Sequence, residues 1–155
     1  MNKLLLTLLA TVTPALAADP FVGTWKPVVE KSRFSPGGGE SRKTHLLTLE
    51  SMGKDAYRES ATTFDGKAIE SGPGSSPFTW RIDGKEHPSG TGSSTAKTER
   101  INDRHLKLTV KSQKGTAVED WVVAGDGKTL TVTRKGNGAS TGRPLDELIV
   151  FNKQP

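Results

Sequence analysis

The sequence predicts an all-β protein in which an antiparallel meander closes into a barrel of about eight to ten strands. Three observations support this fold class: short runs alternate apolar and polar residues with period two, turn residues separate the runs, and no useful helix-period stretch follows residue 17. The ranges predicted as strands are 21–29, 43–51, 56–64, 77–83, 95–101, 105–112, 116–124, 128–135 and 145–152.

The first residues have the layout of a secretory signal peptide. Lys3 precedes a short apolar run, which ends in small residues up to Ala17. The apolar run is too short for a permanent membrane anchor, which needs about 20 residues. We therefore expect residues 1–17 to be removed and residues 18–155 to form one soluble, monomeric domain, periplasmic or extracellular, with no transmembrane segment after processing.

Composition excludes several kinds of chemistry. The 155 residues carry a formal net charge of +5, which becomes +4 without Lys3, and they include no Cys. An exported chain without Cys has no disulfides, no thiolate metal ligands and no Cys nucleophile, so packing and backbone pairing must stabilise it. The histidines His45, His87 and His105 lack the spacing of metal ligands. We expect no metal and no cofactor.

Turn residues divide the predicted strands. Asp-Gly pairs at 65–66, 83–84 and 126–127 lie between strand-like runs and suit hairpin turns. Two further turns are predicted at 101–105 and 114–116. The stretches FSPGGGESRK, SGPGSSP, HPSGTGSST and KGNGASTGRP are predicted as loops.

The first predicted strand carries a recognisable triplet. Phe21, Gly23 and Trp25 share one side of it, and Gly23-Thr24-Trp25 resembles the Gly-x-Trp signature of lipocalins and the wider calycin group. The chain from residue 21 to 151 is also similar to small exported bacterial proteins described as lipocalin-like. That resemblance implies a barrel fold and carries no established activity.

The resemblance also implies a barrel-end motif made by Gly23 and Trp25. In lipocalins the Trp packs across the closed end of the barrel under a basic side chain from the region of the last strand. Lys153 and Arg143 are the matching candidates here. The chain departs from lipocalins in having no Thr-Asp-Tyr triplet mid-chain and no clear helix before the final strand.

Alternation in the strands predicts which side chains point inward. Apolar residues share one face of each strand, so the inner wall is predicted to include large apolar side chains that could line a ligand pocket. The pocket candidates are Trp25, Leu47, Phe78, Trp80 and Trp121. The same side chains could instead fill a small barrel completely.

Two carboxylates also fall on the predicted inner face. Glu59 and Glu119 point inward if alternation is taken from Tyr57 and Trp121. Burial would raise the pKa of such a carboxyl group unless a basic partner lies beside it. The partners available if the strand register permits are Arg58, Arg81 and Arg100. No nucleophile elbow or phosphate-binding loop is present, so a non-catalytic protein is predicted.

The strongest charge feature lies between residues 97 and 114. It contains two acidic residues and six basic ones: Lys97, Arg100, Arg104, Lys107, Lys111 and Lys114. On an outer strand face these cations could attract an anionic envelope surface, or they could be an ordinary solvated face that discourages edge pairing. Nucleic acid is not an expected partner, because the chain is predicted to be exported and contains no base-reading motif.

The sequence thus leaves two principal functions open. The first is binding of a small apolar or amphipathic ligand inside the barrel; the alternative is an envelope-associated interaction module that uses the basic face. An enzyme is a third hypothesis, which would require a buried Glu beside a basic group in an open pocket.

Overall fold

A computed structural model describes residues 19–36, 40–64, 78–89 and 93–155. In these ranges the chain forms a ten-stranded antiparallel sheet and two short 3₁₀ helices, η1 (Val29–Lys31) and η2 (Glu40–Lys43). The strands are β1 (Gly23–Pro27), β2 (His45–Ser51), β3 (Ala56–Thr63), β4 (Phe78–Arg81), β5 (Glu86–Ser89), β6 (Ser94–Asn102), β7 (His105–Lys111), β8 (Thr116–Val123), β9 (Thr129–Asn137) and β10 (Pro144–Lys153).

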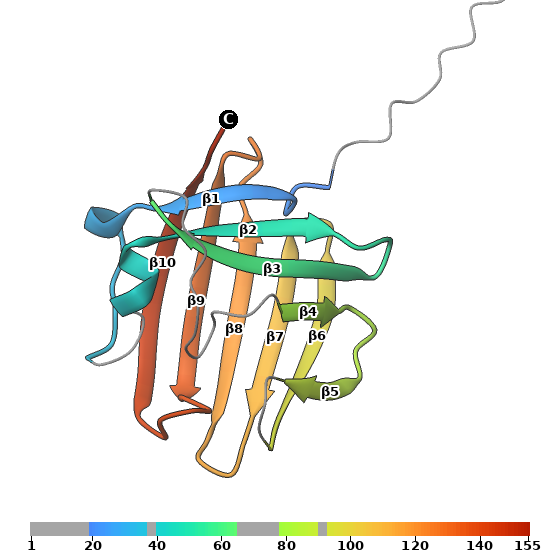
Figure 1. Ribbon diagram of the computed structural model, residues 1–155, viewed down its shortest axis with the longest axis vertical. Helices are drawn as coiled ribbons and strands as arrows, with labels where there is room; N and C mark the ends of the chain where they lie inside the picture. Colours follow the sequence, from blue (N-terminus) through green and yellow to red (C-terminus); the bar gives the residue numbers. More distant parts are fainter. Residues whose placement is uncertain (1–18, 37–39, 65–77, 90–92) are drawn as a thin grey trace, which may run out of the picture.

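The sheet curls into a nearly closed barrel. The strand order is β4-β3-β2-β1-β10-β9-β8-β7-β6-β5, so the first and last strands of the chain pair with each other. Strands β1 to β3 run across the front of β7 to β10 at a steep angle (Figure 1). Strands β4 and β5 are the two edges of the sheet. The predicted all-β meander is therefore confirmed.

Aspartates make the tight turns that the sequence predicted. The Asp83 carboxylate accepts a hydrogen bond from the Lys85 backbone N–H, and Asp126 does the same with Lys128, both at 2.9 Å. A carboxylate that holds the backbone two residues ahead is the expected turn chemistry of Asp. The remaining Asp-Gly pair, at 65–66, lies outside the described residues, as does the predicted signal peptide.

The structure corrects two parts of the predicted element map. The stretch HPSGTGSST begins with strand β5 instead of forming only a loop; its Pro88 is tolerated because β5 is an edge strand. KGNGASTGRP contributes its first three residues to β9. The other strands shift at their ends: residues 29–31 form η1, so the first strand is shorter than predicted, and η2 precedes β2.

The apolar core lies at one end of the barrel. Its largest fully buried side chains include Trp25, Trp80, Trp121, Tyr57 and Phe21.

Within the described ranges, no helix is long and apolar enough to span a membrane.

Candidate functional site

A row of polar side chains crosses the inner face of the barrel wall. Strand register places Glu119 of β8 opposite Arg134 of β9, and Arg134 opposite Glu147 of β10. The row continues through Leu108 of β7 to Thr98 of β6. Both glutamates and Thr98 are buried. A charged row inside a small barrel is costly unless each group is paired.

Arg134 pairs with both glutamates of this row. Its Nε donates to Glu119 Oε1 at 2.7 Å, and its Nη1 donates to Glu147 Oε2 at 2.6 Å. Burial alone would raise the pKa of Glu119, but the charges of Arg134 and Arg42 and the hydrogen bonds it accepts lower it overall. Burial opposes the charged form of Arg134, yet the two carboxylates raise its pKa above the usual value. Glu119 is therefore ionised at neutral pH and Arg134 is charged.

The second oxygen of each glutamate is also satisfied. Glu119 Oε2 accepts a hydrogen bond from Trp121 Nε1 at 3.0 Å, and Glu147 Oε1 accepts one from the Ser35 backbone N–H at 3.2 Å. These contacts hold both carboxylates in one orientation. The triad of Glu119, Arg134 and Glu147 is thus a rigid, fully bonded ionic cluster.

Glu59 faces this triad from the opposite wall. Its Oε2 accepts a hydrogen bond of 2.7 Å from Trp80 Nε1, and the Trp80 ring meets the Trp121 ring edge-on with centroids 4.5 Å apart. Burial is the largest influence on the pKa of Glu59 and raises it; the charge of Glu119 acts in the same direction. Arg42, Trp80 and Arg134 oppose the rise without cancelling it.

Arg42 brings a second guanidinium into this group from η2. Its Nη2 lies 3.9 Å from Glu119 Oε1, and its side chain retains 28% of its accessible surface. It is therefore a looser partner than Arg134, whose side chain is 17% exposed. The five groups form what we call the polar cluster: Arg42, Glu59, Glu119, Arg134 and Glu147.

Side-chain size differs on the two sides of this cluster. The inward row next to it on one side consists of large side chains that are completely buried, Leu106, Trp121, Val132 and Ile149, all at 0% exposure. On the other side, the next row contains the small residues Ala96, Ala117 and Gly136 together with the half-buried Val110 and the buried Leu145. The barrel thus has a solid end filled by large side chains and an end in which smaller ones predominate.

A hollow also opens in the wall between the two sheet edges. It has a volume of about 310 Å³ and is lined by Phe78, Thr79 and Arg81 of β4 and by His87 and Pro88 of β5. Successive residues of a strand point to opposite faces, so a hollow that touches both Phe78 and Thr79 reaches from the outer face toward the inner one. The edge gap is therefore a lateral recess formed by the two edge strands; the buried Trp80 does not line it.

The predicted pocket residues fall in different parts of this arrangement. Trp80 and Trp121 are buried and bonded to the polar cluster, Phe78 lines the edge recess, and Leu47 is buried on β2. Trp25 lies in the solid end. Four of the five belong to one core cluster, and Phe78 packs against it.

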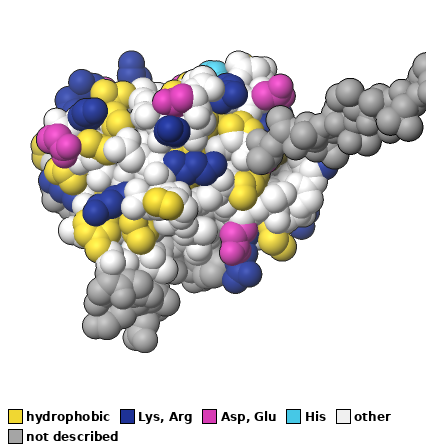
Figure 2. Space-filling view, turned by 90° about the horizontal axis from the view of Figure 1, so that it is seen from above, with side chains coloured by type: hydrophobic (Ala, Val, Ile, Leu, Met, Phe, Trp, Pro, Cys, Tyr) yellow, Lys and Arg dark blue, Asp and Glu magenta, His cyan; other side chains and the backbone are white. Residues whose placement is uncertain are grey.

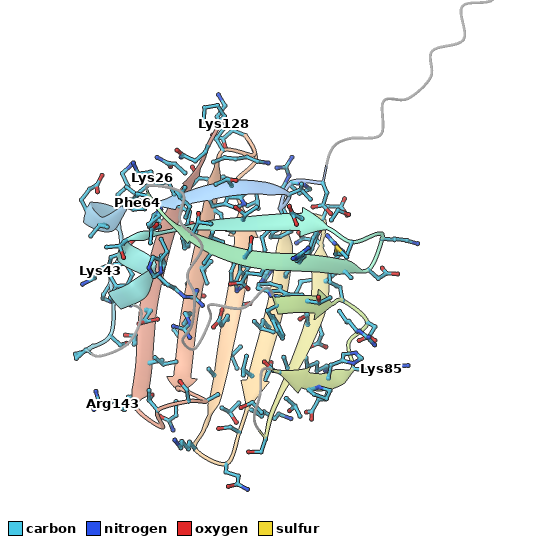
Figure 3. All side chains as sticks on the ribbon, in the orientation of Figure 1. Lys26, Lys43, Phe64, Lys85, Lys128 and Arg143 are labelled. Carbon is cyan, nitrogen blue, oxygen red and sulfur yellow. The ribbon has the colours of Figure 1, made fainter. Side chains whose placement is uncertain are left out.

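The barrel-end motif seals the solid end. Trp25 is fully buried, its Nε1 donates to the Phe21 carbonyl oxygen at 2.9 Å, and Lys153 Nζ lies 5.1 Å from the Trp25 ring centroid. Lys153 is therefore the basic residue over Trp25. Arg143, the other candidate, lies at the opposite end from Lys128, whose carbonyl accepts the Lys153 backbone N–H (Figure 3).

A second contact at this end ties Asp19 to strand β3. The Tyr57 hydroxyl bonds the Asp19 carboxylate and accepts a hydrogen bond from Arg100 Nη2 at 2.8 Å. Burial raises the pKa of Tyr57, and the hydrogen bond to Asp19 raises it further. Arg100 lowers it, but the net result is a pKa of about 12.

Seen from above, basic, acidic and hydrophobic side chains are interspersed over the outer surface (Figure 2).

The predicted basic surface is largely paired with nearby groups. Lys97 bonds Glu99 at 2.9 Å, and Lys111 pairs with Glu86. The side chains of Arg104 and Lys114 donate to backbone carbonyls. Arg100 turns toward Tyr57, and register places Lys107 between Glu99 and Asp120 on the neighbouring strands. The face therefore has mixed charge.

The alternation placed Glu59 and Glu119 inward and left open which arginine would pair with them. None of the three available arginines does: Arg58 is exposed, Arg81 lies at the edge recess, and Arg100 bonds Tyr57. Glu119 pairs instead with Arg134 and Arg42, and Arg134 also pairs with Glu147, which the sequence analysis did not single out. Alternation could have identified two of these three, because Arg134 has the parity of Val132 and Glu147 has that of Ile149.

Two of the three histidines contact carboxylates. His87 Nε2 lies 2.9 Å from Asp83 Oδ2, and His105 Nε2 lies 2.8 Å from Asp120 Oδ1; both side chains are partly buried. His45 is half-buried at the start of β2. Across the described ranges, no group of three metal-ligating side chains converges.

Comparisons with known proteins bear on the fold. No protein-family model and no curated protein sequence matches the chain. Among solved structures, a Schistosoma mansoni fatty acid binding protein in complex with arachidonic acid is similar, with a TM-score of 0.59, 16% identity and coverage of 88% of this chain and 97% of that one. A variant of the fluorescent protein UnaG has a TM-score of 0.59, 12% identity and coverage of 88% and 97%.

A third similar structure is a secretory abundant heat soluble protein from Ramazzottius varieornatus. It has a TM-score of 0.59 and 13% identity, and the match covers 89% of this chain and 98% of that one. Three proteins with little sequence in common thus share nearly their whole length with this barrel. The chain has a calycin-like barrel fold, as its Gly-x-Trp triplet predicted.

Proposed function

We propose that this protein is an exported, non-catalytic carrier that binds a small amphipathic molecule in the polar half of its barrel. The observation that carries the proposal is the change along the inner wall, from rows with no solvent access to a bonded polar cluster bordered by small side chains. Ligand sites combine apolar walls with a few fixed polar groups, and this half of the barrel offers both.

Two further observations support a carrier. The edge recess lies between β4 and β5, the two edges of the sheet, so a ligand could approach the barrel wall there without opening a paired strand. One structural neighbour, the Schistosoma mansoni protein, holds a fatty acid. The signal-peptide layout of residues 1–17 supports export. The full bonding of Glu119 and Glu147, which engages both oxygens of each carboxylate, supports a non-catalytic role for that pair.

The test compares ligand binding in two variants of one strand. Ala117→Phe adds a large side chain on the inner face beside Gly136, whereas Val122→Phe adds one on the outer face, where Val122 is already 40% exposed. Binding is measured by the fluorescence of Nile red, a neutral dye that brightens in apolar sites, and by native mass spectrometry of protein isolated from its own envelope.

The wild type and Val122→Phe should bind the dye, while Ala117→Phe should bind about tenfold more weakly or not at all. Circular dichroism and urea unfolding verify that Ala117→Phe is folded, because overpacking a core typically costs about 1–3 kcal/mol. A wild type that neither brightens the dye nor carries a bound molecule would overturn the proposal. So would equal binding by both variants.

A further inference from the structure

The charges of the polar cluster do not balance. It contains three carboxyl groups, Glu59, Glu119 and Glu147, and two guanidinium groups, Arg42 and Arg134. Buried charges are stable only when they are paired and hydrogen-bonded. One positive charge is therefore missing from the described part of the barrel interior if every carboxyl group is to ionise.

The imbalance falls on Glu59. Glu119 and Glu147 share Arg134 at 2.7 and 2.6 Å, and Arg42 approaches Glu119 rather than Glu59 within ion-pair distance. Within the ranges that the structure describes, Glu59 has no ion-pair partner closer than 4.0 Å; its bonded contact there is the neutral Trp80 indole N–H. Glu59 also retains part of its accessible surface.

The same geometry disfavours an acidic ligand. A carboxylate entering this space would meet three carboxyl groups and an Arg134 that already binds two of them. Like charges held close together in a poorly solvated site repel each other strongly. Arg42 could contribute attraction, but only by weakening its approach to Glu119.

We propose that the ligand carries one basic amine group, for which Glu59 is the counter-ion. This inference rests on the proposed carrier function. The ammonium group would pair with Glu59, whose Oε2 the buried Trp80 indole N–H holds in place. The alkyl part would lie against Phe78 of the edge recess and Val110 of the row of smaller side chains. Both residues pack against the core while remaining partly exposed. The site thus takes an amphipathic amine in preference to a fatty acid.

The experiment compares three ligands that differ only in the head group. Lauryl amine, lauryl alcohol and laurate compete with Nile red for the full-length processed protein at neutral pH, below their micelle-forming concentrations. The amine should displace the dye at a concentration about tenfold lower than the alcohol, and laurate should be weaker than the alcohol.

Two variants assign the preference to Glu59. Glu59→Gln keeps the side-chain shape and removes the charge, so the amine should bind no better than the alcohol. Glu50→Gln on β2 is the matched control, because Glu50 is exposed and pairs in register with Arg58 on the outer face. It should leave the amine preference unchanged.

The outcomes separate the two proposals. If the dye binds but laurate displaces it as well as or better than the amine, the amine inference is wrong and the carrier function stands. Equal displacement by amine and alcohol, or an amine preference that survives Glu59→Gln, also overturns it. If the wild type binds neither dye nor any of the three ligands, the carrier function itself fails.

Discussion

Arg134 is the side chain whose loss should most destabilise the barrel interior. Arg134→Met keeps the length of an unbranched side chain and removes both hydrogen bonds to buried carboxylates. Breaking a buried ion pair by removing one partner costs about 3–5 kcal/mol, because the remaining charge stays buried without compensation. Here two carboxylates lose a partner, but Glu119 retains Arg42 nearby. We therefore expect a loss of about 3–5 kcal/mol in the free energy of unfolding.

A neighbouring ion pair supplies the control. Asp146 lies next to Glu147 on β10 but faces outward, where it pairs with Arg33 at 3.1 Å; those two side chains are 68% and 62% exposed. An exposed pair contributes about 0–1 kcal/mol, since water screens both charges. Arg33→Met should therefore lower the free energy of unfolding by less than about 1 kcal/mol.

Both variants are measured by urea unfolding at neutral pH, followed by circular dichroism and tryptophan fluorescence. Coincident transitions and an unchanged slope with urea establish that the two free energies can be compared. Similar small losses for Arg134→Met and Arg33→Met would refute the view that the triad is a desolvated cluster. A triple variant with Leu, Met and Leu at positions 119, 134 and 147 should recover most of the stability, because apolar side chains of similar volume avoid the desolvation cost.

Three further predictions concern single positions. Tyr57 is the only tyrosine of the chain, so its ionisation can be followed by absorbance; its midpoint should lie at about 12, and a midpoint near 10 in folded protein would contradict the bond to Asp19. Gly136→Ala should lower the thermal midpoint more than Gly23→Ala. Both glycines have positive φ, but a Cβ at 136 would lie 2.3 Å from a backbone oxygen, whereas at 23 it would meet the movable end of a lysine. Relative to the wild type, Glu59→Gln should raise the free energy of unfolding by an amount that grows as the pH rises above 4.5. The folded wild type favours the protonated Glu59 carboxyl group, so the wild type loses stability as the pH rises through the raised pKa of that group, whereas the glutamine variant does not. Equal pH profiles for Glu59→Gln and wild type would contradict this.

The strands were predictable where alternation is long and undisturbed. Strand β7 alternates apolar and polar residues along all seven positions and β9 along its first five, and their predicted ranges differ from the structure by no more than two residues at either end. Strand β5 was missed because it is four residues long, contains Pro88 and runs into a Gly-rich stretch. Pairing with β6 stabilises it, and local sequence does not record that pairing.

The site was predictable only in part, for a related reason. Alternation indicates which side of a strand a residue occupies, and it placed Glu59 and Glu119 inside. It does not indicate which residue lies opposite, since that depends on the register between strands. Arg42 could not be found this way at all, because it comes from a 3₁₀ turn and reaches the cluster from outside the sheet.

The two ends of the barrel have different physical roles, and each depends on the other. The solid end buries Phe21, Trp25 and Tyr57 almost completely, and this supplies the apolar burial from which a chain without disulfides must gain its stability. The polar cluster contributes little net stability, because desolvation offsets much of the attraction among its charges. A cluster that is costly to bury and only marginally stabilising is hard to explain as a packing device. Its fixed orientation and its uncompensated carboxyl group, Glu59, are the properties expected of a recognition site. The protein tolerates such a site because apolar burial at the solid end supplies the stability that the polar cluster does not.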